Sequence, residues 1–107
     1  MQRQMQATRL LEQSRSLNQE ALFAMERGDL QEADRLLVQA LRICPQDTES
    51  RARYSQLLWR CGKHEEALQQ IQIALRLAPN QPDLHIQAAE QYLELGRLTE
   101  AQGHIDK

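Results

Sequence analysis

The chain of 107 residues is long enough for one domain, and its 41% hydrophobic and 26% charged residues are ordinary values for a globular protein. Its 13 lysines and arginines are scattered among 15 acidic residues, so the basic stripe of a nucleic-acid-binding protein is missing. No apolar run approaches the roughly 20 residues that span a bilayer, and the N-terminus carries no secretion signal. We therefore expect no direct membrane insertion, and a cytoplasmic setting by default.

The first predicted element is one long helix from about residue 3 to Arg27, because neither Gly nor Pro occurs before Gly28. Residues 1–13 form a glutamine-rich helical extension that is continuous with the first helix of the repeats and carries apolar Met5 and Leu10. Two interpretations stay open for this extension. It is a solvated or frayed helix, or it is a contact arm for a second copy of the chain or for another protein.

The rest of the chain repeats with a period of 34 residues. Several residue types keep this register: Gly28, Gly62 and Gly96; Glu32, Glu66 and Glu100; Ala33, Ala67 and Ala101; Leu37, Ile71 and Ile105; Ala40 and Ala74; Pro45 and Pro79. A fixed period of this length indicates stacked units of the same local structure. The register divides the chain into residues 14–47, 48–81 and 82–107, and the last unit is incomplete.

Each unit reads as a helix, a short turn, a second helix and a proline-marked break. The repeated glycines fit the left-handed residue that ends a helix, and Asp29 with Glu32 predicts a reciprocal cap on the next helix. Pro45 and Pro79 cannot continue the second helices and mark their ends. Small residues are placed to meet where the two antiparallel helices of a unit cross: Ala21 with Ala33, Ser55 with Ala67, and Ala89 with Ala101.

The third unit stops at Lys107, within its predicted second helix. Because no polar capping helix follows, we expect four residues to form an open apolar edge: Tyr92, Leu95, Leu98 and Ile105. Either the chain is part of a longer protein, which we favour, or this edge pairs with another molecule. A homodimer through this edge or through the N-terminal helix is the expected consequence for the isolated chain.

The Gly-x-x-x-x-Ala step from Gly28 to Ala33 and the Ala-Leu…Pro pattern of Ala40, Leu41 and Pro45 resemble the second-helix signature of the tetratricopeptide repeat family. The resemblance covers about residues 14–107. It implies an all-α fold: a right-handed superhelical stack of three antiparallel helix hairpins, the third truncated. The first helices depart from the family pattern, because its early Trp is replaced by Leu17, Arg51 and His85 and its later Tyr is present only as Tyr92.

No motif for catalysis, a cofactor or a metal is complete in this sequence. His64-Glu65-Glu66-Ala67-Leu68 lacks the second His of the zinc-protease pattern, and Cys61-Gly62-Lys63 lacks the remaining residues of a phosphate-binding loop. Cys44 and Cys61 are too far apart on the predicted helices to form a disulfide. We therefore predict a protein that is not an enzyme, with no cofactor and no metal site.

First helices line the concave face of such a stack, which predicts a groove for a protein or peptide. Its expected residues are Leu22, Met25, Arg53, Gln56, Trp59, Arg60, Ile86, Glu90 and Leu93, with Asn18, Glu26 and Glu94 beside them. Trp59 is placed on the groove, the alternative being a Trp half-buried between helices. The predicted function is an interaction scaffold for an extended peptide or a partner helix. The alternative is a regulatory or homo-oligomerisation domain of a larger enzyme or membrane-associated protein.

Some members of the family hold a peptide carboxylate with a Lys/Asn/Arg clamp. The resemblance places five residues at the corresponding positions here: Asn18, Leu22, Arg53, Asp83 and Gln87. Asp83 and Gln87 replace the cationic pair of the clamp, so we do not expect docking to heat-shock chaperone tails. An acidic or amphipathic segment is expected to suit Arg53 and Arg60.

Overall fold

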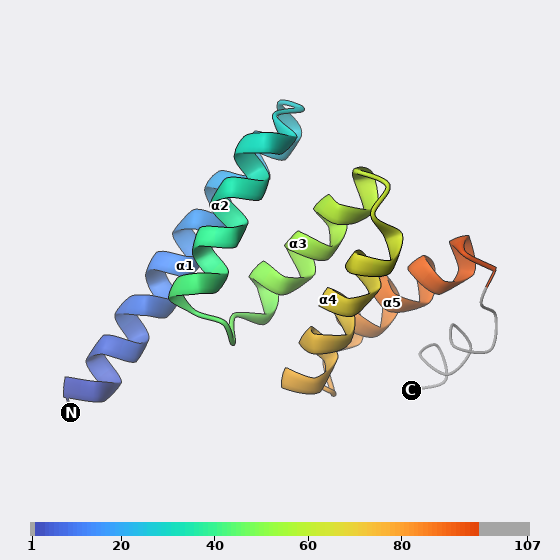
Figure 1. The fold of residues 1–107 in the computed structure, drawn as a ribbon. Coiled ribbons are helices and arrows are strands. Elements are labelled where there is room, and N and C mark those ends of the chain that lie inside the picture. The colour runs from blue at the N-terminus through green and yellow to red at the C-terminus, as the bar shows by residue number, and fades with distance from the viewer. Residues whose placement is uncertain (1, 97–107) are drawn as a thin grey trace.

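The computed structural model of the chain describes residues 2–96, with side chains from residue 5 onwards. Within this range the backbone forms helices and no strand (Figure 1). The helices are α1 (Gln2–Glu26), α2 (Leu30–Ile43), α3 (Thr48–Arg60), α4 (His64–Leu77) and α5 (Pro82–Glu94). The predicted all-α stack of helix hairpins is confirmed. The second helix of the third hairpin falls outside the described residues.

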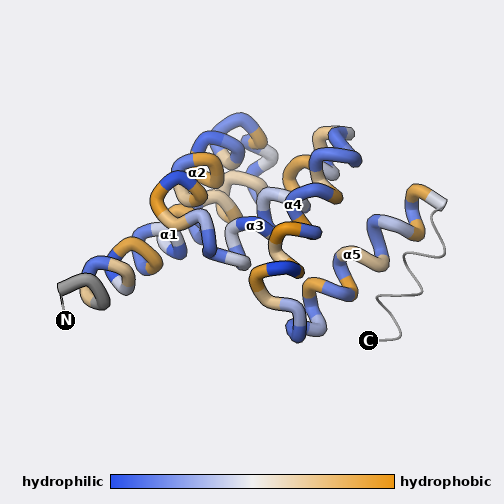
Figure 2. The backbone as a smooth tube through the Cα atoms, turned by 60° about the horizontal axis from the view of Figure 1, so that its bottom comes forward, coloured by the Kyte–Doolittle hydropathy of each residue, from blue (hydrophilic) through white to orange (hydrophobic). Residues whose placement is uncertain are grey.

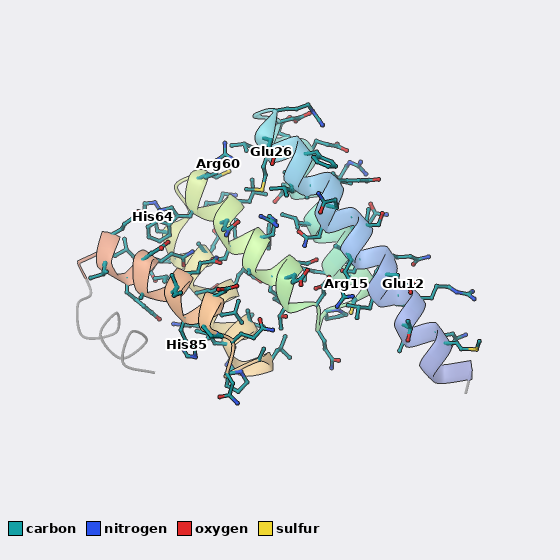
Figure 3. All side chains as sticks on the ribbon, turned by 180° about the vertical axis from the view of Figure 1, so that it is seen from behind. Glu12, Arg15, Glu26, Arg60, His64 and His85 are labelled. Carbon is teal, nitrogen blue, oxygen red and sulfur yellow. The ribbon has the colours of Figure 1, made fainter. Side chains whose placement is uncertain are left out.

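The helices form two layers. Helices α1, α3 and α5 lie in one layer, and α2 and α4 lie in the other, so that α1 pairs with α2 and α3 pairs with α4 (Figure 1). Figure 3 shows the opposite side of the molecule, where α1, α3 and α5 face the viewer. Helix α3 contacts both α1 and α2, which joins the first hairpin to the second.

Glycines with positive φ end the first helix of each hairpin. Gly28 has a φ of 80° and Gly62 a φ of 81°, a conformation that glycine adopts without a steric cost. After each glycine the next amide reaches back into the helix, since Asp29 N donates to Ala24 O at 2.8 Å and Lys63 N donates to Leu58 O at 2.9 Å. The 34-residue glycine spacing is therefore a spacing of turns.

The start of α2 has one of the two hydrogen bonds of a reciprocal cap. Asp29 accepts a hydrogen bond from Glu32 N at 3.2 Å, as the sequence predicted. The predicted return bond from the Glu32 side chain is wrong, because this carboxylate accepts from Arg35 Nε at 3.0 Å. The Asp29 amide already donates to Ala24 O, so it has no hydrogen left for Glu32.

The crossings inside the hairpins are built from small buried residues. Ala21, Ala33 and Ala67 are fully buried, and Ser55 Oγ donates to Ala67 O at 2.7 Å. Small side chains at such crossings let helix axes approach to about 8–10 Å. Apolar and polar residues are interspersed along each helix (Figure 2), and the buried apolar ones form one core around α1, α2 and α3 and another around α4 and α5. The pairing of Ala89 with Ala101 lies outside the described residues.

A buried carboxylate joins the long first helix to the turn between the hairpins. Asp47, which caps α3, is 4% exposed, and its carboxylate accepts from Ser14 Oγ at 2.7 Å and from Ser50 Oγ at 2.8 Å. Ser14 Oγ also lies 3.1 Å from Ala40 O. We call Ser14, Asp47 and Ser50 the Asp47 cluster. This cluster was not expected from the sequence.

The two ends of the stack differ from each other. Helix α1 runs without a break through the expected extension, where Met5 is 66% and Leu10 is 42% exposed. At the other end, the prediction that Tyr92 forms an open apolar edge is wrong, because the ring packs in the core and is 3% exposed. Gln72 Nε2 on α4 donates to its hydroxyl at 2.6 Å, and Leu95 packs half-buried on the same core. Leu98 and Ile105 lie outside the described residues.

None of the helices in residues 2–96 combines the length and the apolar character needed to cross a bilayer.

Candidate protein-binding groove

A groove runs along the layer formed by α1, α3 and α5. One part is a hollow of about 390 Å³, lined by Leu22, Met25, Glu26, Arg53, Gln56, Trp59, Arg60, Gln87, Glu90, Gln91 and Glu94. A second hollow of about 540 Å³ continues it toward the first turns of α3 and α5, and Arg53, Gln56 and Gln87 line both. We call the two hollows together the groove. First helices of three successive hairpins supply its walls.

The predicted groove residues divide into two groups. Seven of the nine expected groove residues line the hollow around Trp59, and so do Glu26 and Glu94, whereas Asn18 is buried outside both hollows. Ile86 and Leu93 lie on α5 outside both hollows and are 56% and 45% exposed. Met25 belongs to the core as well, where it is 6% exposed beside Leu36 and Leu57, so it forms part of the groove floor.

Trp59 is half-buried and fixed on two sides. Its Nε1 donates to Glu94 Oε2 on α5 at 2.8 Å. Its ring stacks on the His64 ring with centroids 4.1 Å apart and an interplanar angle of 29°. The indole therefore bridges α3 and α5 and still contributes to the wall of the groove.

The two groove arginines are used inside the protein. Arg53 Nε donates to Asn18 Oδ1 and its Nη1 donates to Gln56 Oε1, both at 3.3 Å. Arg60 Nη1 donates to Met25 O at 3.3 Å. The bonds to Asn18 and Met25 tie α3 to α1, and within the described chain neither guanidinium forms an ion pair with a groove carboxylate. Both arginines therefore join repeats, a role that was not expected from the sequence, and both also line the groove.

Acidic side chains outnumber basic ones around the groove. Its lining contains five carboxylates (Glu26, Glu49, Asp83, Glu90 and Glu94) and two guanidinium groups (Arg53 and Arg60). Glu26 and Arg60 lie at the same end of the groove (Figure 3). Such an excess of one sign produces a potential that attracts the opposite charge.

Two glutamines on α5 complete the groove: Gln87, which the family resemblance places at a clamp position, and Gln91, which was not expected from the sequence. Gln87 Nε2 donates to Ala52 O at 3.0 Å, and Gln91 Nε2 donates to Ser55 Oγ at 2.9 Å. Gln91 Oε1 is buried and has no hydrogen-bond partner among the described residues. The available signal was position: Gln91 interrupts the buried stripe of α5 between Ala88 and Leu95.

The described residues contain no group of three or more His, Cys, Asp or Glu side chains arranged to hold a metal ion.

Comparisons with known proteins agree with this architecture. A sequence profile described as Tetratricopeptide repeat matches residues 24–76. Among solved structures, MamA AMB-1 is 29% identical with a TM-score of 0.71, covering 80% of this chain and 51% of its own. The chain therefore spans about half the length of that relative. A search of curated proteins gave no match.

Two more distant structures share the fold. The second TPR of Spaghetti (RPAP3), bound to the HSP90 peptide SRMEEVD, has a TM-score of 0.81 and 17% identity, covering 90% of this chain and 89% of its own. PilF of Pseudomonas aeruginosa has a TM-score of 0.77 and 22% identity, and the match covers 87% of this chain and 43% of PilF. The profile match, the 34-residue register on both sides of it and the stacked hairpins lead to one conclusion. Residues 24–76 match the tetratricopeptide repeat family, and the described helices have the stacked-hairpin fold of its members.

Proposed function

We propose that this chain is a non-catalytic protein-interaction scaffold whose groove binds an extended peptide or a partner helix. The observation that carries the proposal is the groove itself, formed jointly by α1, α3 and α5. Its floor is apolar where Leu22 and Met25 lie, and its rim is charged. A segment with one apolar side and one polar side would bury the first on the floor and pair the second at the rim.

Trp59 is the residue best placed to contribute binding energy. Tryptophan is among the residue types most enriched at interaction hot spots. Because Glu94 and His64 already fix the Trp59 ring, a ligand would not have to immobilise it, which lowers the entropy cost of binding.

The peptide-bound RPAP3 domain supports this general mode of binding, since it shares the fold of this chain. Its ligand is an acidic chaperone peptide, as its sequence shows. In this chain Asp83 and Gln87 line the groove at the positions where the family's clamp has cations. We therefore propose a ligand other than a chaperone tail.

A second candidate function is a regulatory or homo-oligomerisation domain of a larger polypeptide. Met5 and Leu10 favour it, because both are large apolar side chains exposed on α1. In that case α1, and not the groove, would carry the contact. Light scattering that shows a strict monomer at high concentration would remove the homo-oligomer.

Site-specific photocrosslinking in cells separates the two functions. A photoreactive residue at Gln56, in the groove, should trap a partner, whereas one at Gln69, exposed on α4, should not. Trp59→Ala should abolish the Gln56 adduct, and Phe23→Ala is the matched control because Phe23 is an aromatic residue 50% exposed outside both hollows. Equal crosslinking at Gln69, or an unchanged adduct in Trp59→Ala, would overturn the proposed groove.

A further inference from the structure

We infer that the segment bound by the groove is cationic, with Lys or Arg side chains that pair with Glu26 and Glu90 and donate to Gln91 Oε1. This inference rests on the proposed function of the groove and adds the chemical class of its ligand. Three observations carry it: six side chains of the groove donate to acceptors within the protein, and, among the described residues, two of its carboxylates form no ion pair and one buried acceptor has no donor.

Side-chain donors of the groove are directed to acceptors within the chain. The bonds run from Trp59 Nε1 to Glu94, from Arg53 to Asn18 and Gln56, from Arg60 to Met25 O, from Gln56 to Gln87, from Gln87 to Ala52 O, and from Gln91 to Ser55. These hydrogens are already bonded, which reduces the number of donors that the groove offers to an acidic ligand. A ligand that brings its own donors does not depend on them.

The hydrogen bonding of Ser55 determines which atom of the Gln91 amide has no partner. Ser55 has a single hydroxyl hydrogen, and its Oγ donates that hydrogen to Ala67 O at 2.7 Å. Ser55 Oγ can then only accept from Gln91, so Nε2 must face it and Oε1 must face away. Buried polar atoms almost always have a partner, and one without a partner among the described residues needs a donor from outside them, which a water or a bound ligand can supply.

Carboxylates on both sides of the groove lack a partner. Glu26 on α1 and Glu90 on α5 line the same hollow, are exposed, and form neither an ion pair nor a side-chain hydrogen bond within the described chain. The remaining charges of the lining do not cancel them, since five carboxylates face two guanidinium groups. Complementary charge steers association and selects the partner.

A charge series of short peptides tests the inference. The probe alternates pairs of leucines with pairs of lysines, and its two relatives carry glutamine or glutamate in place of lysine. Binding is read from Trp59 fluorescence, because Trp59 is the only Trp in the chain, and from the anisotropy of a labelled peptide. We expect the lysine peptide to bind tightest and the glutamate peptide to bind weakest, with the difference shrinking at high salt.

Matched charge variants separate the groove from the overall charge of the protein. Glu26→Gln combined with Glu90→Gln should weaken the lysine peptide about three- to ten-fold. Glu12→Gln combined with Glu20→Gln removes the same charge from exposed positions of α1 outside the groove and should leave the affinity unchanged.

The possible results distinguish the cationic ligand from the proposed protein-binding function of the groove. Tighter or equal binding of the glutamate peptide, or an equal loss in both double variants, overturns the cationic ligand and leaves the groove as a binding site. If none of the three peptides binds and Gln56 traps no partner in cells, the proposed function falls and the inference falls with it.

Discussion

The two junctions between successive repeats both contain buried polar side chains, but they use them differently. At the first junction, Asp47 accepts hydrogen bonds from Ser14 and Ser50, and no atom of the Asp47 cluster is left without a partner. At the second junction, Gln91 bonds Ser55 through its nitrogen, and its oxygen has no partner among residues 5–96. The polar atoms of the Asp47 cluster are all hydrogen-bonded, and its residues do not line the groove. Gln91 has an unbonded oxygen and lines the groove.

This difference separates a stabilising polar cluster from one that we propose serves binding. A buried network in which each member is satisfied rigidifies a junction and fixes its geometry. An unpaired buried acceptor lowers stability, so its presence at Gln91 needs another reason, and the adjacent groove provides one. Changing the residues of each junction should therefore have opposite effects on stability.

The largest effect is expected for Asp47→Ala. This change leaves Ser14 and Ser50 without their acceptor and removes the cap of α3, which should lower the free energy of unfolding by about 2–4 kcal/mol. Denaturant unfolding measures the loss. Asp47→Asn keeps one acceptor oxygen and should lose less. A loss below about 0.5 kcal/mol in the alanine variant, the range of ordinary surface changes, would contradict a structural role for the cluster.

Ala67→Leu tests the crossing to which Ser55 is bonded. Ala67 is fully buried, so the larger side chain should overpack the α3–α4 crossing and cost about 1–3 kcal/mol. The thermal midpoint measures the effect. Gln69→Leu is the control, because it adds a leucine at an exposed position of the same helix. Equal midpoints for both variants would mean that the crossing is not tightly packed.

Gln91→Met should act in the opposite direction from the Asp47 variants. Methionine has a similar shape and removes the unpaired oxygen, while Ser55 keeps its bond to Ala67 O. We expect a gain of about 1 kcal/mol in unfolding free energy, together with weaker binding of the lysine peptide. The two measurements are unfolding and fluorescence titration on the same sample. A less stable variant would show that Gln91 is a structural residue like Asp47.

The smallest effect concerns Tyr54, which packs half-buried beside the core of the first junction. Burial raises the pKa of Tyr54, and the nearby Asp34 carboxylate raises it further. The folded state therefore holds its proton more tightly than the unfolded state, and stability should fall as the pH rises above the ordinary tyrosine value of 10.0. Tyr54→Phe should flatten this alkaline decline in unfolding free energy. An unchanged pH profile would assign the decline to other groups.

The sequence predicted what depends on period and chain direction. Gly28 and Gly62 could be placed in turns because few other residues tolerate positive φ, and the unbroken run before Gly28 predicted α1. The side of the first helices that lines the groove also followed from helical spacing, as Gln56 and Trp59 illustrate.

What the sequence did not predict depends on three-dimensional neighbours. Asp47 could be suspected as a helix cap, but its bond to Ser14 joins residues 33 positions apart. Arg53 and Arg60 could be assigned to a face, yet only the packing of α1 against α3 shows that their acceptors lie within the protein. Tyr92 was misplaced because its partner, Gln72, comes from the preceding hairpin.

Amide chemical-shift mapping with the lysine peptide tests the central claim, that the layer of α1, α3 and α5 binds a partner, most directly. Titration of the isotopically labelled chain should move resonances around Leu22, Gln56 and Glu90 and leave those of α2 and the exposed side of α4 in place. Shifts that gather on α2 and α4, or no shifts at saturating peptide, would contradict the account.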